Sequence, residues 1–321
     1  MFGLKPRTLY YWYKENLSGY RQARACGEWG GKFIRKVNEQ TGEVVAEKEI
    51  PIIKAGNMGA NMTIDEKQIG KMMYTVMTNA DSGKIALVAP TLKPDELQQV
   101  MDNYLPVESQ KVQSVSCDMS PSYKKFCKNA FPQAELIIDK FHVVKHLMDA
   151  LHLVRKQLKT QCINSGKTLA IPTKEQAVWT DIELLERSRY IITKMQSDWT
   201  VDEKQMMTHL FVNYPILQKA YELTQKFRKW YHPDNIGRNT DFIERDLDNW
   251  CDDVLQSKIP AFRAVRKMIE KHQPDIINYF KKGQTNAKAE NINGKIQRFI
   301  ANNFGIKDRD FFFFRLAGYF S

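Results

Sequence analysis

Apolar residues along the chain follow two different patterns, one typical of strands and one typical of helices. Between Met62 and Ile138, short apolar runs alternate with turn signals and with two brief segments of helical period. The predicted strands cover residues 62–66, 72–79, 85–89, 112–117 and 134–138. The predicted helices lie between the last three strands, at 93–103 and 120–130.

The order of these elements, β-β-β-α-β-α-β, is typical of the ribonuclease H-like fold, a mixed five-stranded sheet with helices on both faces. Residues 141–277 instead repeat apolar positions at spacings of three and four, which predicts helices almost throughout. A last helix is expected at 287–302, and the four phenylalanines at 311–314 are expected to be buried against the sheet. The fold class expected is therefore α/β, with an all-α insertion.

The N-terminal segment has a weaker pattern. Residues 4–17 predict one helix, in which Leu9, Trp12, Tyr13 and Leu17 could form an apolar stripe. Glycines interrupt the following stretch, which we interpret as a connector with a turn at T-G-E between two short extended runs. The expected divisions are 1–60 for the helical segment and connector, 61–149 and 286–321 for the two parts of the α/β domain, and 150–285 for the all-α insertion.

The charge balance of the chain indicates the kind of partner that it binds. The chain has 48 Lys and Arg against 37 Asp and Glu, a net charge of +11, which favours a polyanion such as nucleic acid. Its five cysteines include no C-x-x-C pair, so neither a disulfide scaffold nor a zinc knuckle is expected. No signal-peptide core or membrane span is apparent, and we expect a cytoplasmic, nucleoid-associated protein.

Three carboxylates occupy places where this fold would bring them together. Asp65 lies on the first predicted strand, Asp118 ends the fourth, and Glu290 lies in the first turns of the last helix. The first and fourth strands are neighbours in a ribonuclease H-like sheet. Converging carboxylates repel unless a cation compensates, and their oxygens suit Mg²⁺ or Mn²⁺, which support phosphoryl transfer. The alternatives are a strand-edge charge, a helix cap and a solvated helix residue, respectively.

The segments around these residues resemble the DDE transposases of bacterial insertion sequences, specifically the ISL-three (ISL3) family. The strongest similarity is in D-M-S-P-S-Y-K-K at 118–125 and F-P-Q-A-E-L-I-I-D-K-F-H-V-V-K-H-L at 131–147. T-I-D-E at 63–66 and N-A-K-A-E-N-I-N-G-K-I at 286–296 are similar to the blocks around the first and last acids. The resemblance implies a catalytic, metal-binding triad of Asp65, Asp118 and Glu290 that cleaves transposon ends and joins them to target DNA.

Two departures from the family leave an alternative open. The zinc-binding segment usual at the N-terminus is absent, and R-T-L-Y-Y-W-Y at 7–13 looks like a recognition helix whose partner would precede Met1. The chain could therefore be a shortened relic that binds DNA without cutting it. A third hypothesis is a ribonuclease H-like nuclease without strand transfer. The active form is expected to be a homo-oligomer on DNA.

Other charged and polar residues could support the acidic site or contact DNA. Asp139 ends the fifth predicted strand, and His142 follows it. We expect both side chains to contact and orient the metal ligands, in preference to binding zinc themselves. Basic residues that could contact DNA phosphates, each with a solvated surface as its alternative, are Arg7, Lys226, Arg228, Lys229, Lys295 and Arg298.

Overall fold

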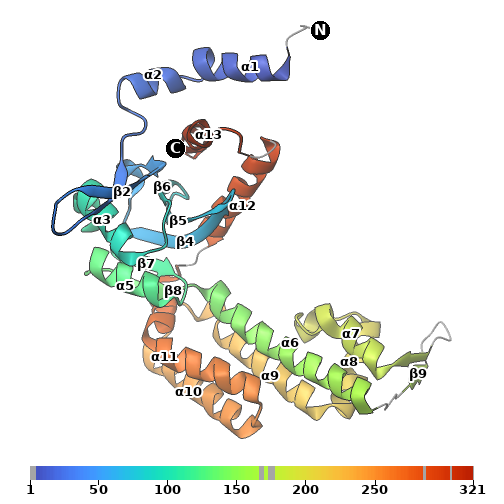
Figure 1. The fold of residues 1–321 in the computed structure, drawn as a ribbon. Coiled ribbons are helices and arrows are strands. Elements are labelled where there is room, and N and C mark those ends of the chain that lie inside the picture. Colours follow the sequence, from blue (N-terminus) through green and yellow to red (C-terminus); the bar gives the residue numbers. More distant parts are fainter. Residues whose placement is uncertain (1–4, 166–169, 173–177, 285–286, 304–305, 321) are drawn as a thin grey trace. The chain divides into compact units, whose positions relative to one another are not determined.

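The computed structural model describes residues 5–165, 170–172, 178–284, 287–303 and 306–320. These pack into two compact units, one formed by Met1–Asp139 with Gln284–Ser321 and the other by Lys140–Gly283. The chain therefore leaves the first unit directly after its last strand and returns to it before its last two helices (Figure 1).

The first unit contains a mixed six-stranded sheet. β4 runs parallel to β7, and β7 parallel to β8, whereas the other neighbours are antiparallel. In spatial order the strands are β3 (Ile52–Ile53), β6 (Ile85–Ala89), β5 (Met72–Asn79), β4 (Asn61–Ile69), β7 (Ser114–Cys117) and β8 (Glu135–Ile138). All five predicted strands form, and the mixed α/β architecture agrees with a ribonuclease H-like fold.

The prediction of only five strands was wrong. β3 adds a sixth strand by pairing Ile52 with Val88 and Ile53 with Leu87 at the edge of the sheet. A two-residue strand directly after Pro51 is too short to show any alternation of apolar and polar residues.

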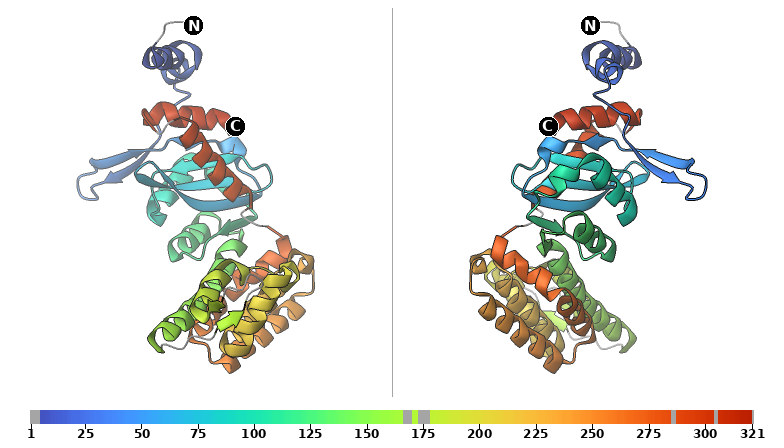
Figure 2. Two further views of the ribbon diagram at one scale, coloured as in Figure 1. Left: turned by 90° about the vertical axis from the view of Figure 1, so that its right-hand side faces the viewer. Right: turned by 90° about the vertical axis from the view of Figure 1, so that its left-hand side faces the viewer.

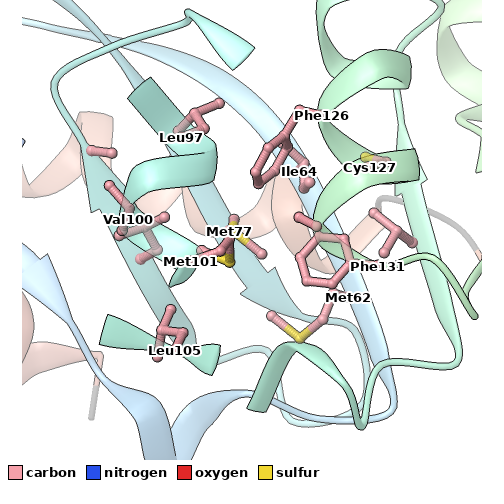
Figure 3. Packing of buried hydrophobic residues seen from close by; sticks show 14 of the residues in the cluster. Met62, Ile64, Met77, Leu97, Val100, Met101, Leu105, Phe126, Cys127 and Phe131 are labelled. Carbon is pink, nitrogen blue, oxygen red and sulfur yellow. The ribbon is translucent and has the colours of Figure 1, made fainter. Parts of the chain in front are cut away.

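One face of the sheet is covered by α3 (Pro94–Tyr104), α4 (Pro106–Ser109) and α5 (Pro121–Ala130), each with a proline in its first turn. Leu97, Val100 and Met101 recur at helical spacing on α3 and are fully buried. They pack in one cluster with Met62 and Ile64 of β4 and with Phe126 of α5 (Figure 3). This core holds β4 against both helices, and so fixes the strand that carries Asp65.

The opposite face is covered by α12 (Ala287–Asn302) and α13 (Arg309–Tyr319). Ile292 and Ile296 of α12 join Tyr74 and Val76 of β5 in a second core cluster. The predicted helix 287–302 is thus confirmed, whereas α13 was not predicted. Three of the four consecutive phenylalanines, Phe311–Phe313, are buried as expected. Four adjacent aromatic residues have no helical period, which is why the sequence did not reveal the helix.

The N-terminal part differs most from its prediction. The expected helix 4–17 is α1 (Pro6–Trp12) followed by a π-helical turn, η1 (Tyr13–Leu17), and a second helix follows. The expected apolar stripe faces solvent, with Leu9 and Trp12 each 51% exposed. The supposed connector contains α2 (Tyr20–Ala25), a hairpin of β1 (Phe33–Val37) and β2 (Val44–Glu49), β3, and the 3-10 turn η2 (Ala55–Asn57).

The second unit is a helical bundle, as the apolar spacing predicted. Its centre is aromatic: Trp250 and Phe227 are fully buried with ring centroids 4.8 Å apart. The helices are α6 (Lys140–Ser165), α7 (Asp181–Ile191), α8 (Val201–Asn213), α9 (Pro215–Trp230), α10 (Thr240–Ser257) and α11 (Pro260–Lys282), joined in part by the 3-10 turns η3 (Gln196–Asp198) and η4 (Pro233–Asn235) (Figure 2).

The all-helical prediction for this stretch was wrong at one place. β9 (Ala170–Pro172) and β10 (Val178–Thr180) form a two-stranded antiparallel ribbon between α6 and α7. Strands of three residues give no measurable alternation, so the sequence offered no signal for them.

In the part of the chain that the structure describes, no helix combines the length and apolar character needed to cross a bilayer.

Candidate active site

Asp65 lies on β4, and Asp118 follows directly after the neighbouring parallel strand β7. β4 and β7 pair Asn61 with Ser114 and Thr63 with Ser116, and the same register continued by two residues sets Asp118 beside Asp65. Residues in register on adjacent strands point to the same face of a sheet. Both side chains are half-buried. The sheet thus brings together two of the three predicted carboxylates.

Both aspartates accept hydrogen bonds from nearby backbone. The amide of Glu66 donates to Oδ1 of Asp65 at 2.8 Å, and the amide of Ser120 donates to Oδ1 of Asp118 at 2.8 Å. The bond to Ser120 forms a turn just before α5, and the N-cap of that helix is Ser120, not Asp118 as the helix-cap alternative required. It occupies one carboxylate oxygen, Oδ1, and fixes the side chain at the end of β7.

Helix α12 reaches the same site through a residue that the sequence analysis did not single out. The side-chain amide of Asn293 donates to Oδ2 of Asp65 at 2.5 Å. Glu290 lies three residues earlier, which on a helix is the same face one turn away, and its side chain is exposed. Among the described residues, the buried Oδ1 of Asn293 has no hydrogen-bond partner. The spacing from Glu290 was the available signal for Asn293.

The pKa of the Tyr123 hydroxyl is affected by the negative charges of this region. This hydroxyl lies 3.1 Å from Oγ1 of Thr75 in the core beneath β5. Burial raises the pKa of the Tyr123 hydroxyl well above its ordinary value, the hydrogen bond to Thr75 lowers it, and the negative charges of Glu66, Asp118 and Asp65 raise it further. Both aspartates therefore act on one buried group, which stays a neutral phenol.

The donor set has the chemistry of a site for a hard divalent cation. Carboxylate oxygens are the ligands that Mg²⁺ prefers, and the unpaired amide oxygen of Asn293 beside Asp65 is a further hard donor. Within the described residues, however, no three Asp, Glu, His or Cys side chains are grouped closely enough to hold a metal ion. Asp65 and Asp118 fit a cation by type and register, and Glu290 is placed on the adjoining helix.

Asp139 and His142 differ in their placement. β7 pairs Cys117 with Ile138 of β8, so Asp139 follows in register with Asp118, one strand further from Asp65. Asp139 is 3% exposed, and its amide donates to the carbonyl of Cys117 at 2.8 Å. His142 is half-buried in α6 of the helical unit, where its ring meets that of Phe141 edge-on at 5.7 Å.

The basic residues predicted near the acids and in α1 are at the surface. Lys295 and Arg298 are exposed on α12, on the part of the helix that follows Glu290. Arg7 is exposed on α1, with its guanidinium 5.9 Å from the ring centroid of Tyr11. All three are placed where a phosphate could reach them.

The basic stretch in α9 is partly engaged within the protein. Lys226 forms an ion pair with Asp253 at 2.6 Å. Arg228 is half-buried and donates to the carbonyl of Thr193 at 2.9 Å. Lys229 is exposed. The three predicted phosphate contacts are therefore not equivalent, because Lys226 and Arg228 bind protein partners.

Comparison with known proteins identifies the family. Residues 62–316 match the model of the ISL3 family of DDE transposases, whose description is "Transposase". The match covers most of the chain and spans all three predicted acids, and the chain belongs to this family.

A curated relative is the transposase for insertion sequence element IS1001 of Bordetella parapertussis, which is 19% identical over 254 residues. The aligned part is 78% of this chain and 58% of that protein, so the chain spans a little over half of the relative's length. No solved structure matches the chain.

Proposed function

We propose that this protein is a DNA transposase that cleaves the ends of an insertion sequence and joins them to target DNA by metal-dependent phosphoryl transfer. The observation that supports the proposal is the parallel pairing of β4 with β7, whose register, continued by two residues, would bring Asp118 beside Asp65 on one face of the sheet. Family membership supports the reaction class. The relative's name refers to an insertion sequence, which supports the kind of substrate.

Asp65, Asp118 and Glu290 are the proposed ligands of Mg²⁺ or Mn²⁺. The continued register would put Asp65 and Asp118 on one sheet face, where their negative charges would repel unless a cation compensates. The backbone bond to Asp118 and the amide of Asn293 on Asp65 would hold these carboxylates in place. When bound, divalent ions activate a water or a 3′-hydroxyl and stabilise the leaving oxygen.

DNA would be held by the basic surface around this acidic site. A net charge of +11 attracts the phosphate backbone at long range, and Lys295 and Arg298 lie on the same helix as Glu290. Arg7 and Lys229 are further candidates, with Lys226 and Arg228 more constrained by their protein partners. Transposon ends and target DNA are the proposed partners, bound by a homo-oligomer.

The helical unit Lys140–Gly283 is proposed to be an insertion that contacts DNA or a second subunit. It starts directly after β8 and ends just before the helix that carries Glu290.

The test is a strand-transfer assay on linear DNA that carries the sequences flanking this chain's own gene, with Mg²⁺ or with EDTA. We expect nicks at the element ends and joined products with Mg²⁺ only. The matched control is Asp118→Asn, which keeps the size of the side chain and removes its charge. Metal-independent products, or equal activity of the control, would refute the proposal.

A further inference from the structure

A cavity in the helical unit is lined by buried and exposed cationic side chains. It lies between α6 and α7 and has a volume of about 400 Å³. The residues that line it are Asp149, His152, Leu153, Arg155, Lys156 and Arg189. We refer to it as the α6–α7 cavity. One water occupies roughly 30 Å³, so the space admits a tetrahedral anion together with several waters.

Arg155 is the unusual member of this lining. Only 5% of its surface is exposed, although arginine is rarely buried without a charged partner. One guanidinium nitrogen donates to the carbonyl of Leu185 at 2.6 Å. Its buried Nε has no hydrogen-bond partner among the described residues. A buried donor left unpaired costs free energy, and a ligand that accepts a hydrogen bond from this Nε would remove that cost.

A second buried polar atom of the cavity lining, on His152, also lacks a partner among the described residues. Nδ1 of His152 is buried and, within the described part of the chain, makes no hydrogen bond. Burial and the positive charges of Arg155 and Arg189 lower the pKa of the His152 imidazole, and Asp149 opposes this effect. Burial, followed by the charge of Arg189, likewise lowers the pKa of Arg155, opposed by Glu186. The site carries repulsive positive charge that an anion would relieve.

The charges around the cavity leave a positive excess. Arg155, Lys156 and Arg189 are cationic, and Asp149 is the one carboxylate among the lining residues described. Glu186, which also acts on Arg155, is engaged in an ion pair with Lys159 at 2.8 Å. Two guanidinium groups near each other suit a phosphate, because their planar N–H donors match its oxygens in pairs.

We propose that the α6–α7 cavity binds a phosphate group through Arg155, Arg189 and Lys156, and that this phosphate belongs to the DNA backbone. The site itself follows from the cavity and its cations alone. Its assignment to DNA rests on the proposed function. A free phosphate monoester has the same chemistry, and the experiment separates the two sources.

The first measurement is a titration of the full chain with inorganic phosphate, followed by NMR of the imidazole protons. The chain has six histidines, so the His152 signal can be identified by its loss in His152→Gln. We expect a saturable shift of this signal with phosphate and none with chloride at equal ionic strength. Removing a charged hydrogen bond in Arg189→Gln should weaken phosphate binding about tenfold or more.

The matched control is Lys145→Gln, because Lys145 is an exposed cation on α6 about 16 Å along the helix from Lys156. It should leave the phosphate titration unchanged. Arg189 is exposed, so its variant should keep the wild-type melting temperature. Absence of a saturable His152 shift, or equal phosphate affinity in Arg189→Gln, would overturn the site.

The second measurement assigns the source of the phosphate. Binding to duplex DNA is measured at several salt concentrations, and Arg189→Gln should lower the slope of log affinity against log salt by about one. An unchanged slope with intact phosphate binding would overturn the assignment to DNA and assign the cavity to a small phosphorylated ligand. Failure of strand cleavage with intact phosphate binding would count against the proposed function and leave the site standing.

Discussion

Replacing Asn293 by alanine should separate activity from stability. The variant loses the 2.5 Å hydrogen bond to Oδ2 of Asp65, and a hydrogen bond to a charged group contributes about 1.5–3 kcal/mol. It also removes the buried, unpaired Oδ1 of Asn293, whose burial costs about 1–3 kcal/mol. The two terms nearly cancel. We therefore expect the free energy of unfolding to change by no more than about 1 kcal/mol.

Activity should respond far more strongly, because Asp65 would no longer be held in one orientation. Loss of a group that orients a metal ligand typically lowers activity or metal affinity about 10–100-fold. Single-turnover cleavage of end-bearing DNA measures this loss, and urea unfolding measures the stability. Gln297→Ala, at an exposed position of the same helix, is the control and should match the wild type in both. Cleavage within about threefold of the wild type, or a large loss of stability, would refute this reasoning.

Three further substitutions test the acidic site, the DNA-binding surface and the packing of the helical unit. Asp118→Asn should abolish strand cleavage and preserve DNA binding, because affinity for DNA rests on many basic groups; retained cleavage would contradict its role. Lys229→Ala should lower the salt slope of DNA binding by about one without changing the melting temperature, and an unchanged slope would remove α9 from the DNA path. Tyr214→Phe should destabilise the helical unit by about 2 kcal/mol in urea unfolding, because it removes the 2.6 Å hydrogen bond to the buried carboxylate of Asp181, and wild-type stability would show that bond to be unimportant.

The sheet could be predicted because its strands carry strong local signals. β4, β5 and β6 are long or fully apolar, and each turn between them contains a glycine, Gly70 or Gly83. The order of strands and helices then predicted that β4 and β7 are neighbours, whereas their register, Thr63 with Ser116, is known only from the structure. Neither residue would stand out without that step.

Other features depend on contacts that no local pattern encodes. β3 forms only because β6 offers it an edge, and α13 is held by aromatic packing against the sheet. The part played by Asn293 depends on how α12 crosses β4, which is decided by the burial of Ile292 and Ile296. The unpaired Nε of Arg155 is likewise visible only after α6 and α7 pack together.

Mapping where the metal binds tests the proposed carboxylate site directly. Fe²⁺ in place of Mg²⁺, with ascorbate and peroxide, generates hydroxyl radicals that cut the polypeptide close to the bound ion. We expect cuts near Asp65, Asp118 and Glu290, suppressed by excess Mg²⁺ and lost in Asp118→Asn. Cuts confined to other segments, or cuts at these three places that persist in Asp118→Asn, would contradict the proposed site.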